Sequence, residues 1–371
     1  MKLPLLVALL ALFSTLIPQL STCLAQGSLT PPGAPAPTMK TLTQIEPRTP
    51  VGTATTPGDS LSSYRIAQPG AYYLTTNLTG VSGRIGIGID SDNVTLDLNG
   101  FALIGVTGSS IGIAVMGIGH TNISVRNGAI QGWGDYGMNM GAGHGCTYRD
   151  LRLSQNIGGL RAGSASVITA CVAIRNTGIG ISAGVASVIT ACSAQQNTNH
   201  GFQATSSGVL LSECNSAENG GNGFHGATSV TYQRCVSRDN TGHGFYADTG
   251  GVFQDCMASV NGTNGVRARA RSYVLRNSCN NNGGAGIAVD GDASRIEANH
   301  VTGNTGAGIE VNGTVNLIFQ NSARGNGLGN YDIVTGNRVG LIVVPTVSGN
   351  ISGNGPGSGF GTTDPWANFA F

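Results

Sequence analysis

The chain has 371 residues, carries a formal net charge of +1, and only 10% of its residues are Asp, Glu, Lys or Arg. So small a net charge gives no reason to expect nucleic acid or a charged membrane surface as a partner. Glycine supplies 59 residues, which suits a fold with many tight corners, because glycine adopts backbone conformations that other residues avoid.

The N-terminus is predicted to be a secretory signal peptide over residues 1–25. A charged start precedes an apolar run over residues 3–20, and small residues follow, so cleavage is expected after Ala25. A membrane anchor is one alternative, but Pro18 and polar neighbours interrupt the run. A lipoprotein signal at Cys23 is another, although the residue before it is larger than usual. Cleavage would leave a mature chain without a transmembrane span, either secreted, periplasmic or at the cell surface.

The segment over residues 26–60 is rich in Pro and Thr and poor in apolar residues, so it is predicted to be a linker. From residue 61 the pattern becomes strand-like, and residues 61–77 are expected to cover the open end of the fold, whose unpaired backbone groups would otherwise be exposed. The main domain is predicted over residues 61–340. The glycine-rich end, residues 341–371, contains aromatic residues and is expected to form a cap on the last coil or a tail.

One short unit recurs between Gly159 and Asn326 with almost constant length. Each copy opens with glycine and an apolar residue, and successive copies are 21 or 22 residues apart. The opening pairs are Gly159-Leu160, Gly180-Ile181, Gly201-Phe202, Gly223-Phe224, Gly244-Phe245, Gly265-Val266, Gly286-Ile287 and Gly308-Ile309. The period is too short for the helix pair of α-solenoids, and the units lack the Leu-x-x-Leu-x-Leu pattern of leucine-rich repeats. One coil of a parallel β-helix fits it.

Two positions of the unit form ladders of like residues. The first ladder reads Leu151, Cys171, Cys192, Cys214, Cys235, Cys256, Asn277, Asn299 and Asn321. The second lies five residues further on and reads Asn156, Asn176, Asn197, Asn219, Asn240, Asn261, Asn282, Asn304 and Asn326. In-register coils stack about 4.8 Å apart, so the Asn amides are predicted to hydrogen-bond from coil to coil. Asn also tolerates the left-handed conformation that a sharp corner needs, so this ladder is predicted to mark a corner.

The strand after each opening glycine is predicted to be half buried, because its residues alternate with period two. Its first and third places are apolar or small, as in Phe202 and Ala204, and point inward. The second place points to solvent and reads Arg161, Ser182, Gln203, His225, Tyr246, Arg267, Ala288 and Glu310. Another apolar series stands three residues before the first ladder and reads Ile168, Ile189, Leu211, Tyr232, Phe253, Val274, Ile296 and Ile318. A bend or bulge is predicted between the two, since an unbroken strand cannot bury residues three apart.

The coil length, interior ladders and asparagine stack resemble those of right-handed parallel β-helix repeat proteins, the superfamily that contains pectate lyases. The resemblance covers roughly residues 85–340. It implies an all-β fold, a single-stranded right-handed parallel β-helix (solenoid) of about twelve coils with asparagine and cysteine ladders. The ladder cysteines are expected to be free packed thiols, because neighbouring Cβ vectors run parallel and leave the Cβ atoms too far apart for disulfides. Fold alone does not imply function.

The candidate catalytic residues lie on the outward side of these strands. Arg267 stands at the second place, and Asp248, Arg269 and Asp290 each stand two residues beyond the second place of their coils. The two aspartates are two coils apart, about 9.6 Å, near the upper end of the carboxylate separation in inverting glycosidases. A pectate-lyase-like site would need carboxylates that hold Ca²⁺ and an Arg that acts as base; no residue pattern otherwise indicates a metal. The alternative is a surface charge ladder, which adds little stability.

The candidate ligand-binding residues are His225, Tyr246 and Glu310, all at the second place. They are predicted to bind a polysaccharide or cell-surface glycan laid across the coils, with a sugar ring stacked on Tyr246. If the protein is an enzyme, a polysaccharide lyase or glycoside hydrolase is expected; Gly143-His144-Gly145 resembles a polygalacturonase motif whose partner motifs are absent. The competing hypothesis is a structural or adhesive surface protein. Aromatic and charged residues confined to one face favour glycan binding, and an evenly polar surface favours the alternative.

Overall fold

The computed structural model describes residues 46–344 and 363–371. Contacts divide the chain into two units, Met1–Pro47 and Arg48–Phe371, and the second holds the fold. The predicted signal peptide, with Cys23, and most of the predicted linker lie outside the described residues. Within those residues every regular element is a β-strand. No helix long and apolar enough to span a membrane occurs in the part of the chain that the structure describes.

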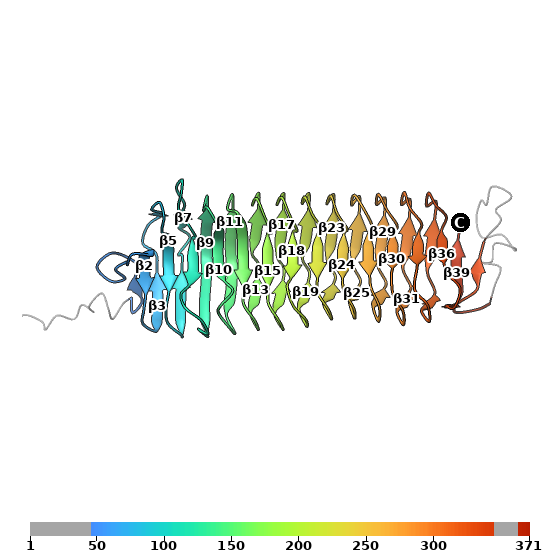
Figure 1. Ribbon diagram of the computed structural model, residues 1–371, viewed down its shortest axis with the longest axis horizontal. Coiled ribbons are helices and arrows are strands. Elements are labelled where there is room, and N and C mark those ends of the chain that lie inside the picture. The colour runs from blue at the N-terminus through green and yellow to red at the C-terminus, as the bar shows by residue number, and fades with distance from the viewer. Residues whose placement is uncertain (1–45, 345–362) are drawn as a thin grey trace, which may run out of the picture. The chain divides into compact units, whose positions relative to one another are not determined.

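One strand of each coil belongs to a 13-stranded parallel sheet (Figure 1). In order its strands are β2 Ser62–Ile66, β5 Ile85–Ile89, β8 Ile113–Val115, β10 Tyr136–Met140, β12 Gly158–Ala162, β15 Ile181–Ala183, β18 Phe202–Ala204, β21 Phe224–Gly226, β24 Phe245–Ala247, β27 Val266–Ala268, β30 Ile287–Val289, β33 Ile309–Val311 and β36 Tyr331–Ile333. The fold class is as predicted, and the number of coils is slightly larger than the predicted twelve.

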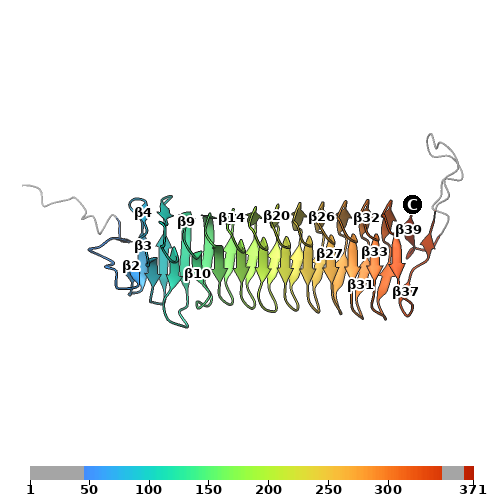
Figure 2. The ribbon, with the colours of Figure 1, turned by 45° about the horizontal axis from the view of Figure 1, so that its top comes forward.

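The other strands form a 26-stranded parallel sheet that divides into two stacks (Figure 2). The first stack contains β1 Thr49–Pro50, β3 Gly70–Tyr73, β6 Val94–Asp97, β13 Val167–Thr169, β16 Val188–Thr190, β19 Leu210–Ser212, β22 Thr231–Gln233, β25 Val252–Gln254, β28 Tyr273–Leu275, β31 Arg295–Glu297, β34 Leu317–Phe319 and β37 Arg338–Val339. The second contains β4 Leu78–Thr79, β7 Ala102–Ile104, β14 Val172–Ile174, β17 Ser193–Gln195, β20 Asn215–Ala217, β23 Val236–Arg238, β26 Met257–Ser259, β29 Ser278–Asn280, β32 His300–Thr302, β35 Ser322–Arg324, β38 Ile342–Val343 and β39 Asn368–Ala370. The long strands β9 Ile123–Gln131 and β11 Thr147–Ser154 pair with strands of both stacks.

Successive coils pair in register, so like residues stack inside the fold. Phe202 lies beside Phe224, and Phe224 beside Phe245, with ring centroids 4.9 and 4.7 Å apart. All three rings are fully buried. The third residue of each of these strands also faces inward, as Ala204 and Ala247 show. The predicted alternation of buried and outward residues is therefore confirmed for these strands.

Each corner is made by a residue in the left-handed conformation, but this residue is not the ladder asparagine. Asp239 has a φ of 54°, and the next residue, Asn240, turns its side chain into the interior. The predicted corner is confirmed. The residue in the left-handed conformation is the one before the ladder asparagine, and not the asparagine itself, as was predicted. A residue in the left-handed conformation also lies between Ile168 and Cys171, where Ala170 has a φ of 53°. The bend predicted between those two buried residues is therefore present.

Both ladders are continuous in the interior. Each ladder asparagine from Asn156 to Asn304 donates a hydrogen bond from Nδ2 to Oδ1 of the next, over 2.9 to 3.2 Å. The first ladder begins with the buried Leu151, continues as a column of buried thiols, and ends with Asn277, Asn299 and Asn321, which bond to one another in the same way. All seven cysteines in the described ranges are free and buried, as expected for thiols that pack as small hydrophobes.

Candidate functional site

One line of outward side chains crosses the 13-stranded sheet, and we name it the outward row. From β5 to β36 the paired residues are Gly88, Ala114, Asn139, Arg161, Ser182, Gln203, His225, Tyr246, Arg267, Ala288, Glu310 and Asp332. Ser182 and Ala288 are only 2% exposed, because their small side chains are covered by their neighbours, so the predicted exposure of the second place is wrong for these two coils. Paired residues stand about 4.8 Å apart along the stack. The structure thus places all three predicted ligand-binding residues, and the predicted catalytic Arg267, on one face.

Aromatic and imidazole rings stack on one another in the middle of the row. The rings of His200 and His225 lie 4.4 Å apart and 6° from parallel, and those of His225 and Tyr246 lie 4.9 Å apart and 12° from parallel. His243 lies against the same tyrosine, at 6.1 Å. One face of the Tyr246 ring is therefore already covered by His225, and its hydroxyl donates to Asp248 over 2.8 Å. Stacking between coils leaves ring edges, rather than open faces, for a ligand.

Sequence reasoning missed two members of this stack, His200 and His243. Each stands directly before an opening glycine, outside the strand whose alternation the sequence revealed. In both cases the imidazole nevertheless stacks on a ring of the row. A histidine before Gly201 and again before Gly244 was the available signal, but only the register of the coils shows that the rings meet.

Burial keeps these imidazoles neutral. It lowers the pKa of His200 to about 4, with a smaller contribution from the charge of His225. Burial likewise lowers the pKa of His243 to about 4, helped by the positive charge of Arg267. Nδ1 of His200 accepts a hydrogen bond from the Asn222 backbone N–H over 2.9 Å, so the proton of the neutral ring is on Nε2. The row therefore carries neutral donors at neutral pH.

The predicted catalytic residues form two ion pairs next to the stack. Nε of Arg267 donates to Asp290 over 2.8 Å, and Nη1 of Arg269 lies 3.8 Å from Asp248. Asn312 bridges the carboxylates of Asp290 and Glu310. Burial alone would raise the pKa of Asp290, but hydrogen bonds from Arg267 and Asn312 outweigh it and hold that pKa below its usual range. Asp290 is thus an ionised acceptor, whereas a general acid of a glycosidase needs a raised pKa.

A Ca²⁺ ion does not fit between these carboxylates. Asp248 and Asp290 each contact a guanidinium, so a cation bridging them would meet two positive charges, those of Arg267 and Arg269. No group of three or more His, Cys, Asp or Glu side chains could hold a metal ion within residues 46–344 and 363–371. The row therefore offers hydrogen bonds and ion pairs to a ligand.

A hollow of about 400 Å³ opens at the N-terminal end of the same row. Ala114, Asn139 and Arg161 of the row line it, together with Met116. The small side chain of Ala114 leaves this space, and the exposed Arg161 makes no ion pair with any described residue. A pocket of this size is typical of small-ligand sites. This hollow was not predicted from the sequence, because the coils before Gly159 lack the regular repeat.

Comparisons with known proteins agree with this architecture. Residues 187–326 match a family model described as a right handed beta helix region. Similar solved structures include two A-modules of mannuronan C-5 epimerases from Azotobacter vinelandii. The AlgE6 module is 15% identical, with 82% of this chain and 90% of that chain covered and a TM-score of 0.49. The AlgE4 module is 16% identical, with 73% and 86% covered and a TM-score of 0.47.

A third similar structure is the Dettilon tailspike protein, at 12% identity, with 75% of this chain and 58% of that chain covered and a TM-score of 0.41. Likenesses this distant say nothing about a substrate. No curated protein matches the chain. The family match over residues 187–326 and the in-register coils on either side of it show that the fold is a right-handed parallel β-helix, as the repeat predicts.

Proposed function

We propose that this exported protein binds an extended polysaccharide laid along the outward row. The proposal rests mainly on the stack of half-buried rings formed by His200, His225 and Tyr246. On the next coil Arg267 follows Tyr246, so the edges of neutral rings lie next to a positive charge. Sugar hydroxyls both donate and accept hydrogen bonds, as neutral imidazoles do. A ligand with a repeating unit also suits a surface that repeats about every 4.8 Å.

Export rests on the predicted signal peptide, and the protein is proposed to work outside the cytoplasm, as a secreted, periplasmic or cell-surface protein. Binding is favoured over processing of the glycan for a chemical reason. Asp290 is ionised and paired with Arg267, so it is poorly suited to protonate a leaving group. A more specific version of the proposal is that the protein also cleaves the bound glycan, as a polysaccharide lyase or hydrolase. Analysis of the reaction products tests this version.

A non-enzymatic structural or adhesive role is the second candidate, and a specific observation favours it. Ion pairs of the same kind occur at the corner between the first and second stacks, outside the row, where Arg234 contacts Glu213 at 2.8 Å and Arg276 contacts Asp255 at 2.7 Å. Charged residues are therefore not confined to one face. A surface that is evenly charged would serve contact with a matrix as well as binding of one glycan.

A binding experiment distinguishes glycan binding along the row from a structural or adhesive role. The purified protein is screened against neutral and acidic polysaccharides, and ultraviolet absorbance reports any unsaturated uronide product. A row variant, Tyr246→Phe with Arg267→Gln, is compared with Tyr273→Phe, which lies on an exposed part of the first stack. We expect about tenfold weaker binding for the row variant, the size of a lost charge-assisted hydrogen bond. Equal binding by both variants would reject the row as the glycan site.

A further inference from the structure

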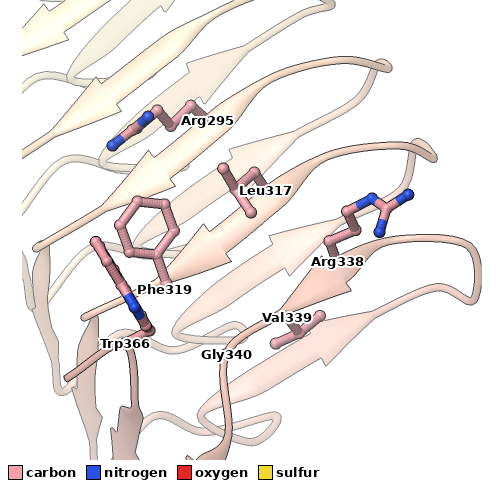
Figure 3. A pocket seen from close by; sticks show the side chains of 7 residues that line it. All are labelled: Arg295, Leu317, Phe319, Arg338, Val339, Gly340 and Trp366. Atoms are coloured by element: carbon pink, nitrogen blue, oxygen red, sulfur yellow. The ribbon is translucent and has the colours of Figure 1, made fainter. Parts of the chain in front are cut away.

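A second hollow, of about 370 Å³, lies on a different surface, the outward face of the first stack near its C-terminal end (Figure 3). Arg295, Leu317 and Arg338 line it from three successive strands, which pair in register. Figure 3 shows Phe319 and Trp366 side by side, with Leu317 and Arg338 across from them. The hollow thus joins an aromatic wall to an apolar floor and a cationic rim.

The aromatic wall is held in place by the last residues of the chain. Strand β39 inserts between β35 and β38, and Asn368 at its start extends the first ladder by bonding to Asn321 over 3.1 Å. Gln320 donates to the carbonyl of Pro365 over 2.9 Å. A Cβ added to Gly340 would lie 2.1 Å from the carbonyl oxygen of Trp366, so only glycine permits this approach. The backbone that carries the indole is therefore held in place by the fold.

The indole itself remains open to solvent. Trp366 is 55% exposed, although its ring meets that of the buried Phe319 edge to face, with centroids 5.3 Å apart. An exposed tryptophan supported from behind by a second ring is a surface on which a sugar ring can stack. In the outward row, by contrast, neighbouring rings cover one another.

The two guanidinium groups differ in how far they are neutralised. Arg295 donates to Glu297 over 2.6 Å and lies over the Phe319 ring, at 4.8 Å from its centroid. Arg338 is exposed, and no acidic side chain of the described ranges pairs with it. One positive charge of the hollow is thus left for an anionic ligand. The planar fork of arginine matches a carboxylate with two parallel hydrogen bonds.

From these observations we infer that the hollow binds the uronate unit of an acidic saccharide. The pyranose ring lies against Trp366, the carboxylate pairs with Arg338, and Leu317 contacts the apolar side of the ring. This site shares no residue with the outward row, so it stands whether or not the row binds a polysaccharide. It would give the C-terminal coils a preference for carboxylated over neutral sugars.

The two tryptophans of the chain allow a direct test, because Trp133 is 2% exposed and only Trp366 is open to solvent. Acrylamide quenching of tryptophan fluorescence is measured on the full chain with trigalacturonate and with a neutral trisaccharide, galactotriose. We expect trigalacturonate to protect Trp366 from quenching and galactotriose to have little effect. Arg338→Gln should weaken the protection about tenfold, as expected for the loss of a charge-assisted pair.

Arg324→Gln is the matched control, since it removes the same charge from an exposed arginine of the last coils that packs on Phe371 outside the hollow. This variant, and the row variant Tyr246→Phe with Arg267→Gln, should keep full protection. Equal protection by both trisaccharides, no protection by either, or a loss that is the same for Arg324→Gln and Arg338→Gln would each overturn the proposal. Retained protection in the row variant separates this site from the proposed function.

Discussion

The side-chain amide of Asn240 donates to the side-chain carbonyl of Asn261 over 3.0 Å, while its own carbonyl accepts from the backbone and side chain of Asn219. The same Nδ2 also lies within 3.0 Å of Ser237 Oγ. The amide is 2% exposed, so water does not replace these partners. Each ladder asparagine therefore joins three coils, and the ladder holds the register on which both candidate sites depend.

Replacing Asn240 by Leu should destabilise the protein strongly. The change breaks the side-chain bonds to Asn219 and Asn261 and removes the acceptor of the buried Asn219 backbone N–H, at a cost of about 1 to 3 kcal/mol for a buried group left without a partner. Urea denaturation gives the free energy of unfolding. The control is Gln203→Ala, a change at a half-buried position of the outward row. Equal denaturation midpoints for the two variants would contradict the structural role of the ladder.

Val260→Asn should stabilise the protein. Val260 has a φ of 56° and is 50% exposed, so a β-branched residue occupies the left-handed conformation with little packing to offset the strain. Asp239 and Asn281 fill the equivalent corner of the neighbouring coils with φ of 54°. Relief of the left-handed strain is worth about 1 kcal/mol. Thermal unfolding measures the gain in stability. The control is Val167→Asn at an outward strand position, which should not be stabilised.

The stability of the protein should fall as the pH is lowered from about 6.5 towards 4. An unfolded histidine has a pKa of about 6.5, whereas burial holds the pKa of His200 and His243 at about 4 in the fold. Between these values the unfolded chain binds protons that the folded chain excludes, so unfolding is favoured as the pH drops. The stability is fully present above pH 6.5.

Melting temperatures measured between pH 7.5 and 4.5 check this prediction. His200→Gln combined with His243→Gln should flatten the dependence on pH, while Gln203→Ala should leave its slope unchanged. An unaltered slope in the double variant would show that these imidazoles are not the responsible groups.

The fold was predictable because a repeat of constant length reports the same local environment many times. The ladders at Cys171 and Asn156 and the corners between strands follow from that periodicity. The periodicity does not reveal which residue forms each corner, because Asp239 and Asn240 are both polar and both tolerate a left-handed conformation. Only burial of the second side chain decides between them.

The candidate sites were harder to predict because they depend on contacts between coils. His225 and Tyr246 were found from their place in the strand, but their stacking on each other follows from the register and hides the ring face expected to carry a sugar. The C-terminal hollow needs Trp366 to return beside Phe319 after a long stretch of chain. The periodicity of the sequence does not predict such a contact.

The last prediction concerns the ion pairs of the outward row. Arg267 and Arg269 point outward and contact Asp290 and Asp248, so replacing both arginines by Ala removes two surface cations and leaves two carboxylates unpaired. Surface ion pairs contribute little to stability, so the double variant should fold normally by circular dichroism. The local charge, however, changes from balanced to negative.

If an acidic glycan lies on the row, this double variant should bind it at least about tenfold more weakly, because guanidinium contacts are lost and like charges repel. The matched control is Arg234→Ala with Arg276→Ala, which breaks two similar ion pairs at the corner between the first and second stacks and changes the net charge equally. Binding is measured for both variants at low and high salt. An equal loss in both would indicate an effect of total charge. Unchanged affinity in the folded row variant would favour the structural role, since two unbalanced carboxylates on the row should repel an acidic glycan bound there.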